Sequence, residues 1–327
     1  MGSYIIRRLL LIIPTLFAIM VVNFAVIQIA PGGPVEQVIA QLTGTGADIT
    51  ERVTRSGTSE TLDTGQGNNT NPTYRGAQGL DPEFIKELEK QFGFDKPLPV
   101  RFVDMMKRYL VFDFGDSFFR DRKVTELVLD KMPVSISLGL WTTLLVYLIS
   151  IPLGIRKAIR DGSRFDIWTS SVIILGTAIP SFLFAVFLLV IFAGGSYLDW
   201  FPLARMTSEN WDSLSWPARV VDYFWHLALP VLAMTIGGFA TLTMLTKNSF
   251  LDQINQQYVL TARAKGLTEH RVLYGHVFRN AMLIIIAGFP SAFVGILFTG
   301  SLLIEIIFSL DGLGLLGFEA AFARDYP

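Results

Sequence analysis

The 327-residue sequence contains no cysteine and only three histidines, and charged residues make up 17% of it. The absence of cysteine excludes disulfide scaffolds, thiolate nucleophiles and cysteine-ligated zinc or iron–sulfur centres. The formal net charge of −1 gives no general electrostatic basis for binding nucleic acid. A disordered chain is excluded as well, because that class has few apolar residues and a large net charge.

Motifs of the common enzyme classes are also missing. There is no G-x-x-x-x-G-K-[ST] phosphate-binding loop, no H-E-x-x-H zinc helix and no G-x-S-x-G nucleophile turn. His270 and His276 are six positions apart, so on a helix they do not share a face as two metal ligands would. We therefore expect no catalytic residue and no bound metal or cofactor, and any energy that the protein uses must come from another chain.

Hydrophobic residues make up 51% of the sequence and gather in five long runs. None of the runs contains Asp, Glu, Lys or Arg, and each reaches the roughly 20 residues that a helix needs to cross a bilayer. In hydrocarbon the backbone must satisfy its own hydrogen bonds, so such runs are helices. One run could be a buried core helix, but five could not. The sequence predicts an all-α, polytopic membrane protein with spans at Leu9–Ala30, Val134–Ile155, Ile167–Leu198, Tyr223–Thr246 and Asn280–Ile304.

Lysine and arginine are unevenly distributed among the connections between these runs. They are frequent at the N-terminus, between the second and third runs, and between the fourth and fifth. The positive-inside rule assigns all three regions to the cytoplasm. We therefore expect a cytoplasmic N-terminus and first span in residues 1–30, an external loop or cap in 31–133, and a transmembrane core in 134–327 with a cytoplasmic loop at 247–279.

The external segment changes composition twice. Residues 44–79 are rich in Gly, Thr, Asn and Ser and predict a flexible loop, because they can bury little apolar surface. Two amphipathic patterns follow, Asp81–Phe92 and Val100–Phe112, and both predict helices. They could form a small cap on the membrane surface or be two unrelated surface helices, and periodicity does not distinguish these alternatives.

The connection 247–279 has the most specific pattern. An apolar stripe predicts one helix, which Gly266 ends. The stripe consists of Leu251, Ile254, Tyr258 and Ala262. Thr268 is a suitable N-cap for a second, short helix. The segment has five basic residues against two acidic ones, and the small side chains beside the turn would let another protein approach closely. A helix lying on the membrane surface would give the same pattern.

Two motifs in this connection carry a family resemblance. The run Thr261-Ala262-Arg263-Ala264-Lys265-Gly266, followed by His276-Val277-Phe278-Arg279-Asn280-Ala281, resembles the cytoplasmic signature of ABC importer permeases of the oligopeptide/dipeptide branch. Blocks elsewhere agree in order: Pro31–Pro34, Gly93–Pro97, Phe114–Ser117, Gly300–Phe308 and Arg324–Pro327. The Glu-Ala-Ala of the general importer pattern is replaced by Leu260-Thr261-Ala262, as is usual in the peptide branch. Within that branch the resemblance is strongest to the B-type permeases of one peptide-uptake system.

The resemblance implies the type I permease fold of ABC importers, with five spans in this chain and a sixth that is expected of such permeases but absent here. It also implies a groove of a cytoplasmic ABC ATPase that receives the coupling residues Leu260, Thr261, Ala262, Arg263, Ala264, Lys265 and Gly266. The two nucleotide-binding domains of that partner would hold ATP and Mg²⁺. The other implied partners are a second homologous permease subunit, an external peptide-binding protein, a peptide substrate and the lipid bilayer of a bacterial inner membrane.

Several polar residues interrupt or adjoin the apolar runs. Candidates to line a translocation pathway are Thr177, Ser181, Thr299, Ser301 and Glu305. The hydroxyls could equally join helices by hydrogen bonds, and Glu305 could lie in headgroup water or cap a turn. The alternative function is a stand-alone channel or an ion-coupled secondary transporter, and the latter predicts internal repeats that are not evident in the sequence.

Overall fold

The computed structural model describes residues 2–29, 95–195, 197–298 and 301–325, together with residues 35, 38, 39, 83, 86, 87 and 90. Throughout these residues the regular structure is helical, apart from one isolated bridge between Asp116 and Lys123. The predicted all-α class is confirmed. The expected loop at 44–79, most of the expected helix Asp81–Phe92 and Thr299 lie outside the described residues. The chain forms two compact units, residues 1–127 with 317–327 and residues 128–316.

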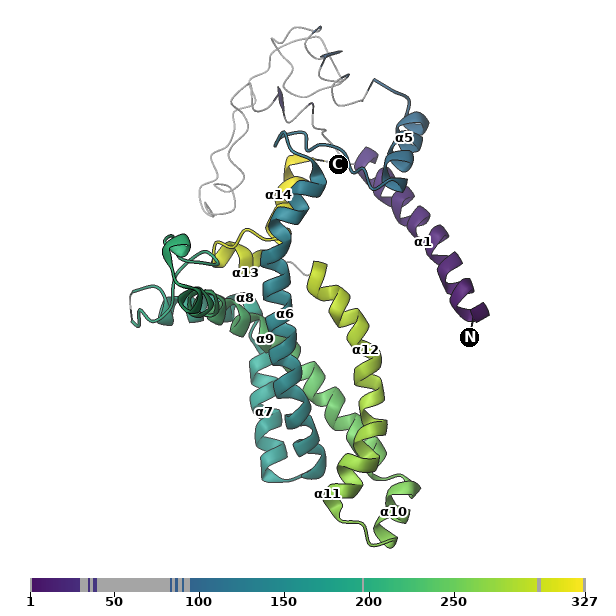
Figure 1. The fold of residues 1–327 in the computed structure, drawn as a ribbon, viewed down its shortest axis with the longest axis vertical. Helices are drawn as coiled ribbons and strands as arrows, with labels where there is room; N and C mark the ends of the chain where they lie inside the picture. The colour runs from purple at the N-terminus through teal and green to yellow at the C-terminus, as the bar shows by residue number, and fades with distance from the viewer. Residues whose placement is uncertain are drawn as a thin grey trace, which may run out of the picture. The chain divides into compact units, whose positions relative to one another are not determined.

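The first unit contains α1 (Gly2–Ile29) and α5 (Leu98–Leu110) (Figure 1). α1 is almost wholly apolar and leaves most of its large side chains exposed. The Phe102 ring of α5 meets the rings of Phe17 and Phe24 in α1 edge-on, at centroid distances of 6.0 and 5.3 Å. The amphipathic pattern at Val100–Phe112 therefore does form a helix, and Phe102 packs on the first predicted span, whereas Val103 and Leu110 remain exposed.

Three long helices form the frame of the second unit: α6 (Val124–Ile159), α9 (Trp216–Ile254) and α12 (Phe278–Phe298) (Figure 1). Each belongs to a helical segment long and apolar enough to cross a membrane. α6 and α9 extend beyond the predicted spans at both ends. Prolines lie inside all three helices, which membrane helices tolerate because neighbouring groups satisfy the freed carbonyl.

The third predicted span is not one continuous helix. It consists of α7 (Arg164–Ala178) and α8 (Ser181–Phe192), which meet at an angle of 92°. Ile179 at the junction is extended, with φ −90° and ψ 118°, because the proline ring that follows it disfavours the helical conformation. The expectation of an unbroken helix over Ile167–Leu198 is therefore wrong. Counted as one span, the bent pair brings the apolar segments to the five expected.

The fifth predicted span, Asn280–Ile304, is also interrupted. α12 ends at Phe298, and Ile304 belongs to a separate short helix, α13 (Leu302–Ile307). A further helix, α14 (Leu313–Ala323), follows. An unbroken apolar run indicates only that its residues are kept from water. It therefore did not predict the break between α12 and α13. The sequence suggested that Glu305 adjoins a continuous span. It lies instead in the separate helix α13.

Buried apolar side chains of the second unit gather in two clusters. The first cluster joins α6, α8, α9 and α13 and includes Leu138, Ala185, Leu188, Leu227, Ile304 and Phe308. The second cluster lies where the ends of α6 and α9 meet the segment before α12, and comprises Ile155, Ala158, Phe250, Val259, Ala262, Val272, Val277 and Ala281. The second cluster thus supports the connection that carried the family resemblance.

Candidate functional site

The connection between α9 and α12 folds into a helical hairpin. α10 (Gln257–Ala264) and α11 (Glu269–Val272) are its two arms, and a π-helical turn, Leu273–Val277, leads into α12 (Figure 1). The sequence predicted one helix from Leu251 through Ala262, which is wrong. The chain breaks between α9 and α10, where Gln256 is extended with φ −77° and ψ 151°.

The apolar stripe nevertheless identifies residues that pack together. Leu251 and Ile254 from α9 and Tyr258 and Ala262 from α10 all contribute to the second cluster. Ala262 is only 6% exposed, so its small side chain allows close packing within this chain. The break redirects α10 without removing the stripe from the core.

A glycine turn closes the hairpin. Gly266 has φ +79°, a backbone conformation that strains residues with a Cβ. Its N–H donates to Arg263 O at 2.9 Å, and the N–H of Leu267 donates to Ala262 O at 3.3 Å. This pair of bonds is the Schellman pattern, which satisfies the last carbonyls of α10. Thr268 occupies the predicted N-cap position of α11, but its side chain makes no capping hydrogen bond.

An ion pair joins the two arms across this turn. Arg263 Nε donates to Glu269 Oε1 at 2.8 Å, and Arg263 Nη2 donates to Glu269 Oε2 at 3.0 Å. Two parallel bonds orient the arms better than a single contact does. Both side chains are substantially exposed, so the pair adds little to stability and acts mainly on the angle between α10 and α11.

The hairpin presents most of the predicted coupling residues to the outside. Leu260 is 58% exposed although it is apolar. Its exposed neighbours among the predicted residues are Thr261, Arg263, Ala264, Lys265 and Gly266. Ala262 alone points into the second cluster. The outer face therefore combines one large apolar side chain with small residues and positive charge, a composition that suits contact with another macromolecule.

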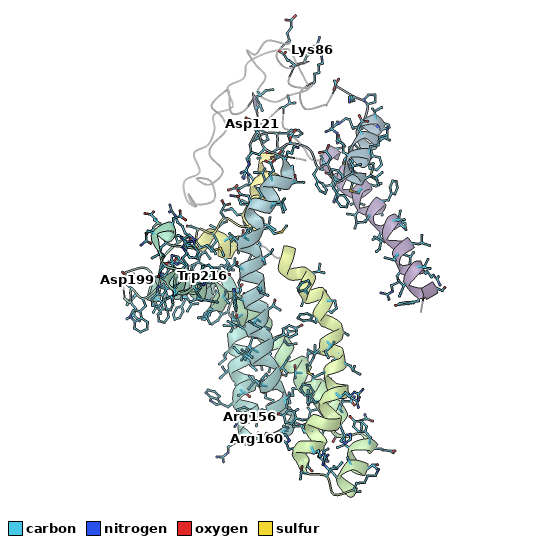
Figure 2. The ribbon with its side chains drawn as sticks, viewed as in Figure 1. Lys86, Asp121, Arg156, Arg160, Asp199 and Trp216 are labelled. Carbon is cyan, nitrogen blue, oxygen red and sulfur yellow. The ribbon has the colours of Figure 1, made fainter. Side chains whose placement is uncertain are left out.

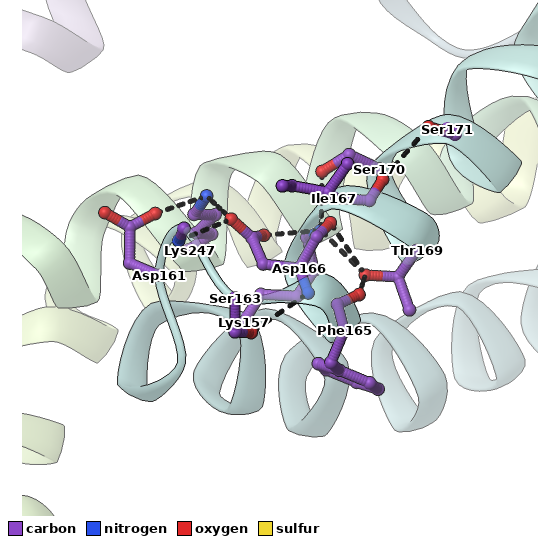
Figure 3. A network of polar contacts seen from close by, with 11 residues as sticks. Lys157, Asp161, Ser163, Phe165, Asp166, Ile167, Thr169, Ser170, Ser171 and Lys247 are labelled. Carbon is purple, nitrogen blue, oxygen red and sulfur yellow. Dashed lines mark hydrogen bonds and ion pairs between the residues drawn. The ribbon is translucent and has the colours of Figure 1, made fainter.

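A buried ionic network lies close to the second cluster, and sequence reasoning missed it. Lys157 of α6 and Lys247 of α9 both bind the carboxylate of Asp166 in α7, with N···O distances of 2.8 and 2.7 Å (Figure 3). Lys247 also binds Asp161 in the turn between α6 and α7 at 2.7 Å. We call Lys157, Asp161, Asp166 and Lys247 the ionic network. The positive-inside rule counts the lysines of the connections only as charges, so it gives no sign that two of them are paired with buried or half-exposed acids.

The ammonium group of Lys157 makes three hydrogen bonds at the buried centre of the ionic network. Lys157 is completely buried, and its Nζ also donates to Asp166 O at 2.9 Å, Thr169 Oγ1 at 2.9 Å and Ser170 Oγ at 2.7 Å. Arg156, in the last turn of α6, and Arg160, just after that helix, are exposed instead (Figure 2). The bonds of Lys157 use every N–H of the buried ammonium, which makes its charge tolerable, whereas Asp166 Oδ1 faces it at 2.8 Å without a hydrogen-bond partner.

The predicted pathway residues fall into two groups. Thr177 and Ser181 flank the bend between α7 and α8, and Thr177 Oγ1 donates to Ile173 O in its own helix at 3.1 Å. Ser301 and Glu305 lie at the start of α13, where Glu305 N–H donates to Ser301 O at 2.8 Å. α8, which begins at Ser181, and α13 meet in the first cluster, whereas Thr177 in α7 is exposed.

Glu305 is completely buried, although α13 lies outside the five long apolar segments. Its carboxylate accepts hydrogen bonds from the N–H groups of Leu315 and Gly314 at 2.7 and 3.4 Å. Burial raises the pKa of this carboxyl, and the two N–H groups oppose that rise because they stabilise the anion. The carboxylate is thus engaged by backbone at the start of α14.

A known protein family matches most of the second unit and the C-terminal residues that follow it. Residues 150–327 match the model described as binding-protein-dependent transport system inner membrane component. The chain belongs to this family. The permease is therefore a transport subunit of an inner membrane, and its polytopic helical fold is that of ABC importer permeases.

Relatives extend the match to the whole permease. The peptidoglycan transport system permease protein YejB of Agrobacterium fabrum is 61% identical over 328 residues, which cover 100% of this chain and 90% of that protein. The inner membrane ABC transporter permease protein YejB of Escherichia coli O157:H7 is 58% identical over the same shares. The oligopeptide transport system permease protein AppB of Bacillus subtilis is 32% identical over 336 residues, again 100% and 90%. The resemblance to B-type permeases of a peptide-uptake system is confirmed.

Proposed function

We propose that this permease is the transmembrane subunit of an ATP-driven importer for oligopeptides or peptide-like compounds. The names of its relatives support this cargo class, since they specify peptidoglycan and oligopeptide transport. Family membership favours this function over a stand-alone channel or an ion-coupled transporter. The substrate itself would enter from an external peptide-binding protein and pass between this chain and a second homologous permease subunit.

The hairpin is the observation that carries the proposed mechanism. Its arms are braced by the Gly266 turn and by the pair of Arg263 with Glu269, so it can move as one body. Leu260, Thr261 and Ala264 on its outer face would lie in a groove of a cytoplasmic ABC ATPase, which binds ATP and Mg²⁺ in its two nucleotide-binding domains. Coupling requires that this groove bind the hairpin differently in its open and closed states.

The same proposal orients the chain in the membrane. The N-terminus is cytoplasmic and the first span lies within residues 1–30; residues 31–133 face the external binding protein, and residues 134–327 form the core with its cytoplasmic loop 247–279. The pathway passes Thr177 and Ser181 at the bend between α7 and α8. Ser301 lines it at the start of α13, and Glu305 shapes it by holding α14. Thr299, which lies outside the described residues, is proposed as a pathway residue from the sequence alone.

A glycine series tests the role of the hairpin. Gly266→Val forces a β-branched residue into the φ +79° conformation and should distort the turn, whereas Gly266→Asn should preserve it, because asparagine tolerates that conformation. Gly275→Ala is the matched control, since a Cβ there meets nothing within 4 Å and the backbone is unstrained. We expect Gly266→Val to insert normally but to lose ATPase co-purification and peptide uptake.

Retention of the ATPase and of uptake by Gly266→Val would contradict the proposal. A second measurement addresses the alternative function. The purified permease without partners should transport nothing in liposomes, because the proposed energy source is absent. Concentrative or ion-driven uptake by this chain alone would establish a stand-alone transporter instead.

A further inference from the structure

The ionic network is the strongest feature of the chain that the coupling hairpin leaves unexplained. It joins three helices, because α6 contributes Lys157, α7 contributes Asp166 and α9 contributes Lys247 (Figure 3). Both lysines bind the same carboxylate. The start of α7 is therefore held against two other helices at once.

Helix packing alone already brings α6 and α9 together at this level. A Cβ added to Gly154, one turn before Lys157, would lie 2.6 Å from Thr246 Cβ and 2.8 Å from Thr243 O. For stability, apolar residues of similar volume would serve as well as a buried ion pair, because desolvation offsets most of the electrostatic attraction. What the charges add is a defined direction, since charge-assisted hydrogen bonds tolerate little change in geometry.

The network also lies on a continuous route from the hairpin to the bend in the third apolar segment. Val259 and Ala262 of the hairpin pack with Ile155 of α6 and Phe250 of α9 in the second cluster. α6 and α9 then meet α7 through the network, and α7 runs to the bend at Ile179–Pro180. A displacement of the hairpin can reach this bend through packed groups at every step.

We propose that Asp166 is a positioning residue for energy coupling, which ties the start of α7 to α6 and α9 so that movement of the hairpin is carried to the bend. Thr177 and Ser181 flank that bend, so the movement would act on the proposed pathway. This inference rests on the proposed ATPase-coupled function. It adds to that function the route by which a movement of the hairpin reaches α7 and α8.

Coupling is measured as peptide imported per ATP hydrolysed, in proteoliposomes that contain the whole transporter. Asp166→Asn removes the charge that both lysines bind. We expect it to lower this ratio about tenfold, while the bound ATPase keeps a hydrolysis rate within about twofold of the parent. Asp161→Asn is the control, because Asp161 is half exposed and binds only Lys247 within the network. Its ratio should stay near that of the parent.

A double variant keeps the test valid if Asp166→Asn fails to fold around an unpaired Lys157. Lys157→Met with Asp166→Leu replaces the buried ion pair by two apolar side chains, a change that protein cores often tolerate. The double variant should insert and assemble but couple as poorly as expected for Asp166→Asn. Parent-like coupling in any assembled Asp166 variant would overturn the inference.

A distance measurement tests directly whether the network keeps the start of α7 in place against α9. The sequence has no cysteine, so Arg164→Cys at the start of α7 and Asn255→Cys at the end of α9 provide two unique, exposed sites for spin labels. In an assembly whose other subunits lack cysteine, we expect one narrow distance that is the same with and without trapped nucleotide. In the double variant this distance should broaden or shift.

A distance that changes on nucleotide trapping in the parent would overturn the inference, as would an unchanged narrow distance in the double variant. The proposed function fails separately. If Gly266→Val releases the ATPase but the Asp166 variants still couple, only the positioning role is refuted. If Gly266→Val retains the ATPase and transport, the coupling hairpin itself is refuted.

Discussion

The buried carboxylate of Glu305 accepts a 2.7 Å hydrogen bond from the backbone N–H of Leu315, in the first turn of α14. The first N–H groups of a helix have no partner inside the helix, and the helix dipole favours negative charge near them. The bond therefore accounts for a completely buried acid. It also links α13 to α14, two short helices that apolar packing alone would orient less well.

Replacing Glu305 tests this link. Glu305→Leu leaves the N–H groups of Gly314 and Leu315 without an acceptor and should lower the free energy of unfolding by about 1–3 kcal/mol. Glu305→Gln keeps an acceptor oxygen and should lose less. Thermal unfolding in detergent, followed by the fluorescence of the six tryptophans, measures both. A Leu variant as stable as the parent would argue against the link.

A substitution at Gly312, which lies against the Glu305 carboxylate, tests the same link. A Cβ at Gly312 would lie 2.5 Å from Glu305 Cδ, so Gly312→Ala must displace the carboxylate from its partners. We expect a loss of about 1–3 kcal/mol in the same unfolding assay. Gly317→Ala is the control, because a Cβ there meets nothing within 4 Å, and it should be neutral or slightly stabilising. Equal stabilities of the two variants would contradict the close approach.

The crossing of α6 and α9 at Gly154 predicts a third effect. Gly154→Ala would place its Cβ 2.8 Å from the carbonyl oxygen of Thr243, and backbone cannot move aside as a flexible side chain can. The two helices should separate, at a cost of about 1–3 kcal/mol. Gly237→Ala in α9 meets open space and serves as the control. A Gly154→Ala protein with unchanged melting temperature would show that the helices cross elsewhere.

A side-chain hydrogen bond between α6 and α9 gives the fourth prediction. Trp141 Nε1 donates to the hydroxyl oxygen of Tyr223 at 3.0 Å. Tyr223→Phe removes this acceptor and should destabilise the protein by about 0.5–1.5 kcal/mol. Tyr197→Phe, at a hydroxyl on a side chain that is 74% exposed, should have no measurable effect. Trp141→Phe removes the donor of the same bond, so in the double variant the bond should not be lost a second time. A double-mutant cycle measures this coupling energy.

Local chemistry made part of the hairpin predictable. Gly266 was expected to end a helix, and it does so with the positive φ that favours glycine there. Thr268 was expected to begin the next helix, and it occupies that position. These signals work because a cap depends on a few neighbouring residues. The break at Gln256 has no comparable signal, since neither glycine nor proline is present, and the stripe continued through it.

Pro180 shows the limit of a local signal. Its ring was visible in the third apolar run, but every predicted span contains a proline and most of these helices continue through it. Among the described residues the sharp bend of 92° arises at Pro180, where Ile179 leaves the helical conformation and α8 packs in the first cluster. Neighbouring helices therefore decide whether a membrane proline bends a helix or is accommodated.

The sequence by itself determined that the chain is a helical membrane protein with five apolar segments, because lipid leaves a long uncharged run no other way to satisfy its backbone. It also determined the glycine turn and the family, since both depend on residues close together in the chain. The tertiary structure alone decided the ionic network, in which Asp166 binds Lys247 from a position 81 residues away. It alone decided, too, that Ala262 faces inward and that Glu305 holds α14. Those outcomes depend on which helix ends meet, and periodicity within one segment carries no information about its neighbours.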